Sequence, residues 1–179
     1  MEAKQRKELP GFARAVLRAK LTGQPIPPPP AGLADRGPPG GLFVTLKNAG
    51  RLRGCIGCFQ PKVGLADAVA EMSVAALKDR RFRDRPVTLK ELDAITIEIS
   101  VLSPMMRTDD PLSLEPGVHG IYIRRGSQAG CFLPQVATEQ RWTPEQFLSH
   151  CCAGKAGLPS DAWKDADTEV YLFTAEVFG

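Results

Sequence analysis

The same order of sequence patterns, a hairpin, a helix and a strand, occurs twice in this chain of 179 residues. The first copy spans 42–103 and the second spans 117–178, and Gly54-Cys55-Ile56 corresponds to Gly130-Cys131-Phe132. Hairpins imply antiparallel pairing, which excludes a doubly wound parallel sheet. We therefore predict an α+β fold of duplicated hairpin-helix-strand units, with mostly antiparallel sheets and flanking helices. Chance recurrence of a common motif is the alternative.

Local signals place the elements of the first copy. Two β-prone runs flank Asn48-Ala49-Gly50, which predicts a hairpin. Apolar residues then recur at helical spacing from Leu65 to Lys78, and Ile95 to Leu102 alternates as a half-buried strand does. In the second copy, a hairpin turns at 126–128 and a capping box at 143–146 opens a helix that stops at Gly157. Residues 168–178 are expected to form one last strand.

A helix and a connector precede the first copy. Apolar residues at helical spacing predict an amphipathic helix within 1–21, of about three turns and starting near Pro10. Residues 22–41 contain seven Pro and five Gly, so they are expected to form a semi-rigid connector without helix or central strand. A Pro-rich ligand for a recognition domain is the alternative for this segment. All parts belong to one domain, residues 1–179.

Composition excludes several classes of protein. A net charge of +3 is too small for a dedicated nucleic-acid binder. Five cysteines are an odd number and the first twenty residues carry charges throughout, which favours a reducing, cytoplasmic compartment without a disulfide framework. No uncharged apolar run reaches about 18 residues, so no membrane span is expected.

The segment RLRGCIG, residues 51–57, is the most informative for chemistry. In a regular strand its side chains divide between two faces, one with Leu52, Gly54 and Ile56 and the other with Arg51, Arg53 and Cys55. A neighbouring cation favours a thiolate, so we predict that Cys55 is a reactive thiol assisted by Arg53. His119 would supply a base if the two hairpins pair. The alternative is that Cys55 is a small buried hydrophobe.

Other signals are weaker. Cys55 and Cys58 form a C-x-x-C pair, but His119 and His150 stand alone and Cys151-Cys152 does not supply a second pair, so no metal is expected. No phosphate loop or nucleophile elbow occurs, and no cofactor is indicated. The basic run 78–85 is either a solvated helix end or a phosphate-binding patch.

Several blocks of the sequence resemble the AMMECR-type domain, whose prokaryotic members are called AmmeMemoRadiSam system protein A. The resemblance runs from about Leu42 to Phe178 and rests on FVTL, LRGCIG, Arg81-Phe82, EISVL, HGIYIRRG, LPQVATE and Trp142. It implies an α+β fold with two unequal subdomains. It also implies that the LRGCIG motif, Leu52 to Gly57, lines a functional site.

The resemblance further implies two partners, a Memo-like protein and a radical S-adenosylmethionine enzyme. Our predicted site has Cys55, Arg53 and His119 as catalytic residues. The predicted lining residues are Arg51, Leu52, Gly54, Ile56, Gly57, Arg81 and Gln135.

Three functions stay open at this point. The protein is an enzyme component acting on a small molecule through Cys55, or a non-catalytic adaptor of the same system that docks a partner on the LRGCIG face. A nucleic-acid-associated regulator is the least favoured. The need for a thiol in the motif favours the enzyme, and the lack of a base or cofactor motif favours the adaptor.

Overall fold

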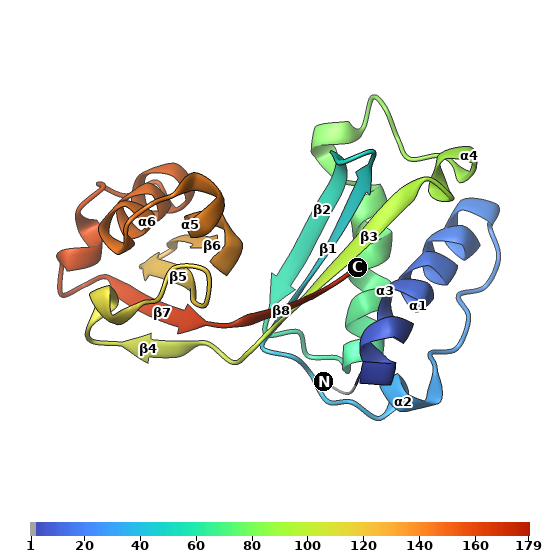
Figure 1. Cartoon of the computed structure of the whole chain (residues 1–179), viewed down its shortest axis with the longest axis horizontal. Coiled ribbons are helices and arrows are strands. Elements are labelled where there is room, and N and C mark those ends of the chain that lie inside the picture. Colours follow the sequence, from blue (N-terminus) through green and yellow to red (C-terminus); the bar gives the residue numbers. More distant parts are fainter. Residues whose placement is uncertain (1–2) are drawn as a thin grey trace. The chain divides into compact units, whose positions relative to one another are not determined.

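The computed structural model describes residues 3–179 and divides the chain into two compact units (Figure 1). The first unit comprises the chain up to Leu102 together with the C-terminal residues Glu176–Gly179. The second unit comprises Ser103–Ala175. Each unit has a hydrophobic core of its own. Among the described residues, no helix combines the length and apolar character that a membrane span requires.

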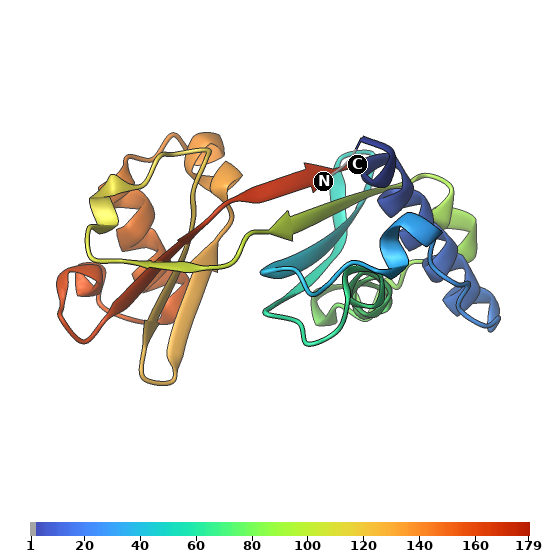
Figure 2. The ribbon, with the colours of Figure 1, turned by 90° about the horizontal axis from the view of Figure 1, so that it is seen from below.

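The first unit is a four-stranded sheet with helices packed on one face (Figure 2). Its strand order is β2-β1-β3-β8, with bounds β1 Gly41–Asn48, β2 Arg51–Phe59, β3 Ile95–Leu102 and β8 Ala175–Phe178. β1 pairs antiparallel with both β2 and β3. The helices are α1 Ala3–Thr22, α2 Ala31–Ala34, α3 Leu65–Leu77, α4 Leu89–Leu92 and the 3₁₀ turn η1 Arg80–Phe82.

Alternating apolar residues decide which face of this sheet is buried. Leu42, Val44 and Leu46 of β1 are fully buried, and the isoleucines of β3 lie in the same cluster against α1 and α3. The hairpin turns at Ala49 and Gly50, both with positive φ, as a type I′ turn requires. The predicted hairpin, helix and strand of the first copy are confirmed within one residue.

Two predictions near the N-terminus are wrong. α1 begins at Ala3 rather than near Pro10, and Pro10 lies inside it. The connector is not free of helix, because Ala31–Ala34 form the single turn α2. Leu33 within this turn is fully buried in the core of the first unit. Burial of one leucine therefore outweighs the Pro- and Gly-rich composition around it.

The second unit contains another four-stranded sheet, in the order β4-β7-β5-β6. The strands are β4 Met106–Thr108, β5 Gly120–Arg125, β6 Gln128–Phe132 and β7 Glu169–Phe173. The helices are α5 Pro134–Gln140 and α6 Pro144–Cys151, which continues as a π turn (η3, Cys152–Ala156), with short 3₁₀ turns η2 Pro111–Ser113 and η4 Ala162–Lys164. The predicted capping box at Thr143 and the stop at Gly157 are confirmed.

The two sheets have the same strand order when read from the edge. In each, the second hairpin strand lies at the edge, followed by the first hairpin strand and then by the strand after the helix. Gly54 of β2 lies against the end of α3, where a Cβ would meet the Ala76 carbonyl oxygen at 2.3 Å. Gly130 of β6 lies in the same way against η3, where a Cβ would meet the Ala156 nitrogen at 2.5 Å. The α+β fold with two antiparallel sheets is confirmed; the repeat boundaries stay a prediction.

The prediction of one last strand is wrong. The segment divides into β7, in the sheet of the second unit, and β8, in the sheet of the first. Phe173 and Phe178 are both buried although they are five residues apart. One regular strand would turn them to opposite faces, whereas strands in two different sheets can bury both. The alternation of apolar and polar residues in 168–178 does not show that the first part of this segment joins one sheet and the second part joins the other.

Candidate functional site

A β-bulge interrupts β2 within the LRGCIG motif. Gly54 lies opposite Leu46, but Leu52 lies opposite Lys47, so Arg53 is the extra residue. The bulge shifts the alternation, and Leu52 faces the side of Lys47 and is 37% exposed. The predicted grouping of Leu52 with Gly54 and Ile56 is therefore wrong. Gly54 and Ile56 do contact the core, on the face covered by α3.

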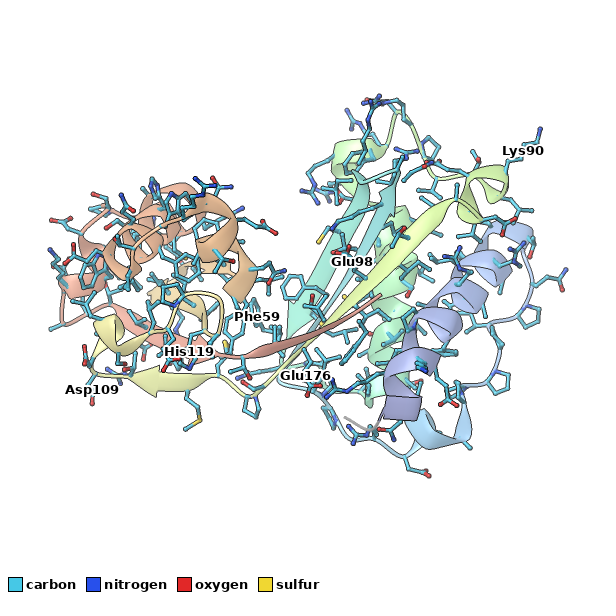
Figure 3. All side chains as sticks on the ribbon, viewed as in Figure 1. Phe59, Lys90, Glu98, Asp109, His119 and Glu176 are labelled. Carbon is cyan, nitrogen blue, oxygen red and sulfur yellow. The ribbon has the colours of Figure 1, made fainter. Side chains whose placement is uncertain are left out.

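Cys55 lies on the sheet face opposite α1 and α3, which we call the outer face. Its sulfur is 3.1 Å from Thr45 Oγ1 on β1. Lys47 lies next to Thr45 on this face and forms an ion pair at 2.8 Å with Glu98 of β3. Glu98 is labelled in Figure 3. Cys55 thus has hydroxyl and charged neighbours, and it is half-buried rather than enclosed in the core.

An aromatic pair borders the outer face beyond Cys55. The rings of Phe43 and Phe59 meet edge to face with centroids 5.6 Å apart. A Cβ at Gly57 would lie 2.2 Å from the Phe43 ring. The second glycine of the motif therefore allows this ring to cross the edge strand.

Asp79 and Arg81 hold the backbone of Cys55 at the free edge of the sheet. The amide N–H of Cys55 donates to Asp79 Oδ2 at 3.0 Å, and Arg81 donates to the Cys55 carbonyl at 3.1 Å. Asp79 also accepts from the Arg81 guanidinium at 2.6 Å. These groups satisfy the edge of β2 as a further strand would. We call this arrangement the edge clamp.

The edge clamp is strongly ionic. Hydrogen bonds from the Arg81 side chain, and then from the amides of Cys55 and Arg81, lower the pKa of Asp79 to about 2 against its burial. The pKa of Arg81 is raised, chiefly by its hydrogen bond to Asp79. The structure therefore places a cation beside Cys55, and that cation is Arg81.

Arg53 and Arg51 take other positions than the strand pattern predicts. The Arg53 guanidinium binds both carboxylate oxygens of Glu91, at 2.6 and 3.0 Å, and the Arg85 carbonyl. Arg51 lies opposite Asn48 in the register of β1 and β2, beside the hairpin turn, and is exposed. The prediction that both arginines share the face of Cys55 is wrong, because the bulge at Arg53 breaks the alternation.

His119 and Gln135 belong to the second unit. His119 is labelled in Figure 3. The two hairpins form parts of different sheets, so the pairing on which a role for His119 was conditional does not occur. His119 Nδ1 accepts the Glu115 amide at 3.0 Å, which fixes the ring within its own loop. Gln135 lies in α5, a helix that the sequence did not indicate. Catalysis by His119 and lining by Gln135 stay predictions.

The cysteines separate into accessible and buried thiols. Cys55 and Cys58 project to opposite faces of β2, since they are three residues apart in a strand. Burial, and then the charge of Glu71, raise the pKa of Cys58. Burial also raises the pKa values of Cys151 and Cys152. None of the five cysteines forms a disulfide, and no group of three metal-ligating side chains occurs among residues 3–179.

The comparison with protein families identifies the chain's relatives. The AMMECR1 family model matches residues 10–178. The chain belongs to the AMMECR1 family. A family member from Methanothermobacter thermautotrophicus is 46% identical over 145 residues, which are 77% of this chain and 74% of that protein. Protein PH0010 from Pyrococcus horikoshii is 39% identical over 176 residues, 92% of this chain and 84% of its own length.

The AMMECR1 fold is also supported by a solved structure. The crystal structure of the uncharacterized protein PH0010 matches with a TM-score of 0.83 and 37% identity, over 97% of this chain and 90% of that chain. Within the site, sequence reasoning found Arg81 but missed Asp79, Thr45 and Glu91. Asp79 lies in a segment rich in arginine, and an acidic residue in such a segment is typical of a solvent-exposed face rather than of a site.

Proposed function

We propose that this AMMECR1-family protein is a thiol-dependent component of an enzyme system, with Cys55 as its reacting group. One observation carries the proposal: the Cys55 sulfur lies on the outer face, hydrogen-bonded to Thr45, while two ionic side chains hold its backbone. A packing cysteine needs neither the hydroxyl nor the clamp. A nucleophile needs a fixed position, which the edge clamp supplies, and Arg81 lies beside Cys55 as a cation paired with Asp79.

The proposed substrate is a small molecule that approaches the outer face. Lys47 and Glu98 offer it one cation and one anion near the thiol, and Thr45 offers a hydroxyl. From the family resemblance, we propose that a Memo-like protein and a radical S-adenosylmethionine enzyme act in the same system.

An adaptor is the second candidate function. The observation that favours it is the half-buried pair Phe43 and Phe59 beside Cys55. Aromatic rings at a sheet edge are common anchors of protein interfaces. In this case the LRGCIG motif shapes a docking surface, and the thiol takes no part in chemistry.

Alkylation of the native protein tests the thiol. Limiting iodoacetamide at pH 7, followed by peptide mass spectrometry, should label Cys55 well before Cys58, Cys151 and Cys152, whose thiolates are disfavoured by burial. Arg81→Gln should slow labelling of Cys55 several-fold. Arg53→Gln is the matched control and should not, because Glu91 holds that guanidinium. Labelling of Cys55 only after unfolding would overturn the thiol proposal.

Copurification with the two proposed partners separates the functions. If the protein is catalytic, Cys55→Ser should preserve the complex and abolish turnover of the assembled system. If it is an adaptor, Phe59→Ala should weaken the complex while Cys55→Ser changes neither binding nor turnover. Failure of the wild-type protein to bind either partner would refute the system proposal.

A further inference from the structure

A pocket of about 600 Å³ lies beside the hairpin turn of the first unit, and Cys55 is not among its lining residues. Three arginines line it, Arg51, Arg53 and Arg85, together with the carboxylate of Glu91. Phe82 adds an aromatic ring to the wall, and Leu52 also lines the pocket. Pockets of this volume hold small organic ligands.

The charges in the pocket are unequal. Glu91 is fully engaged, since its two oxygens accept from Arg53 and one of them also accepts from Asn48 at 3.0 Å. The hydrogen bond from Arg53 is the largest cause that lowers the pKa of Glu91 to about 2, so this carboxylate is ionised at neutral pH. Arg53 and Glu91 thus neutralise one another. Arg51 and Arg85 therefore give the pocket its net positive charge.

Neither of these two guanidiniums forms an ion pair with another side chain among residues 3–179, whereas Arg53 and Arg83 do. Both side chains belong to exposed residues, and they reach the pocket from different segments, the start of β2 and the loop after η1. The Arg53 guanidinium also binds the carbonyl oxygens of Arg85 and Pro86, at 2.9 and 3.5 Å. These contacts tie the loop backbone to the strand, so the segment that carries Arg85 is fixed beside β2 and Arg85 lines the same pocket as Arg51.

We infer that this pocket binds a small organic phosphate monoester, a dianion whose charge Arg51 and Arg85 neutralise. Guanidinium groups recognise phosphate oxygens in pairs of parallel hydrogen bonds. The ring of Phe82 contacts the organic part of the ligand. This binding site is separate from the proposed thiol chemistry at Cys55 and does not depend on it.

The probes are phenyl phosphate, methyl phosphate and inorganic phosphate, each titrated into the full chain by calorimetry. Phenyl phosphate should bind most tightly, because it combines the dianion with a ring that contacts Phe82. Equal binding of inorganic phosphate and phenyl phosphate would overturn the monoester and indicate a site for free phosphate. No measurable binding of phenyl phosphate at millimolar concentration would overturn the site itself.

Charge-matched variants test the residues. Arg51→Gln and Arg85→Gln should each weaken phenyl phosphate binding by about tenfold or more, as loss of a charged hydrogen bond does. Arg83→Gln is the control, because this neighbouring arginine is 81% exposed and lies outside the pocket. An equal loss in Arg83→Gln would show general electrostatic attraction and refute the pocket. Cys55→Ser should leave binding unchanged, which separates this result from the test of the thiol.

Discussion

Cys55 exposes its backbone polar groups at the edge of a sheet, where no neighbouring strand can satisfy them. In an antiparallel pair, residues whose N–H and C=O point outward bring their side chains close to those of the partner strand. The 3.1 Å contact between Cys55 and Thr45 agrees with this geometry. Asp79 and Arg81 then satisfy the two outward groups. The register that places Cys55 opposite Thr45 therefore determines both the position of the thiol and the backbone groups that the edge clamp binds.

Asp79 should make stability depend on pH. Its folded pKa of about 2 lies below the ordinary 3.8, so the ionised form stabilises the fold. This contribution is complete above about pH 5 and is lost as the pH falls towards 2. Asp79→Asn should lower the free energy of unfolding at pH 7 by about 1–3 kcal/mol and flatten its decline below pH 5. Urea unfolding at pH 7 and pH 3 measures both effects.

Glu91 has the same direction of shift and should account for much of the remaining pH dependence. Asp84→Asn is the control for Asp79→Asn, because its side chain is 93% exposed. This control should change stability by less than about 0.5 kcal/mol. An unchanged decline between pH 5 and pH 3 in Asp79→Asn would contradict the role given to the edge clamp.

At the scale of elements, close contact between a glycine and the end of a helix positions the edge strand in each unit. Gly54 allows β2 to lie against the last turn of α3, and Gly130 does the same for β6 against η3. The glycine of the LRGCIG motif is thus required for packing, on the face opposite the thiol. The two functions of the motif, packing and display of Cys55, divide between its two faces.

Gly54→Ala should destabilise the first unit. The added methyl would lie 2.3 Å from the Ala76 carbonyl oxygen, and this neighbour is backbone that cannot move aside alone. We expect a loss of about 1–3 kcal/mol, typical of an overpacked contact. Gly130→Ala should cost a similar amount in the second unit. Thermal or urea unfolding of each variant gives the value.

Gly11→Ala is the matched control for this change. Gly11 lies inside α1 with nothing within 4 Å of its ideal Cβ. Alanine there should stabilise the protein by about 0.5–1 kcal/mol, since it restricts the unfolded chain and favours helix. If Gly54→Ala were as stable as Gly11→Ala, strand and helix would not be in close contact.

At the scale of the whole molecule, two hydrophobic cores share one chain that passes between the units twice. The core of the second unit is centred on Phe147, which is fully buried and stacks on Phe132 with centroids 5.6 Å apart. The core of the first unit collects α1, α3 and the sheet face beneath them. Each core packs against its own sheet, so one unit can unfold locally while the other stays folded.

Phe147→Ala should loosen the second unit selectively. Truncation of a buried phenylalanine costs about 3–5 kcal/mol. Hydrogen exchange followed by mass spectrometry should show faster exchange across β5, β6 and α6, with α3 and β3 little changed. Val69→Ala in the fully buried face of α3 is the reciprocal variant and should affect the first unit. Equal acceleration across both units would show a single cooperative core.

The sequence by itself determined most elements and the family of this protein. Periodicity places α3 and β3, the turn residues place both hairpins, and the capping box places α6, because each of these signals lies within one element. Cys55 and Arg81 were also found, since the motif and its resemblance name them directly. Local rules sufficed wherever the nearest neighbours in the chain decide the conformation.

Only the tertiary structure decided the rest. The bulge at Arg53 depends on the register of β2 with β1, and it moves Arg53 to Glu91 and leaves Arg81 beside the thiol. The division of the last run into β7 and β8 depends on which of the two sheets each part joins, and the burial of Leu33 depends on its contact with the core of the first unit. These outcomes join residues far apart in the chain, and local patterns carry no information about which partner a strand edge or an apolar side chain will meet.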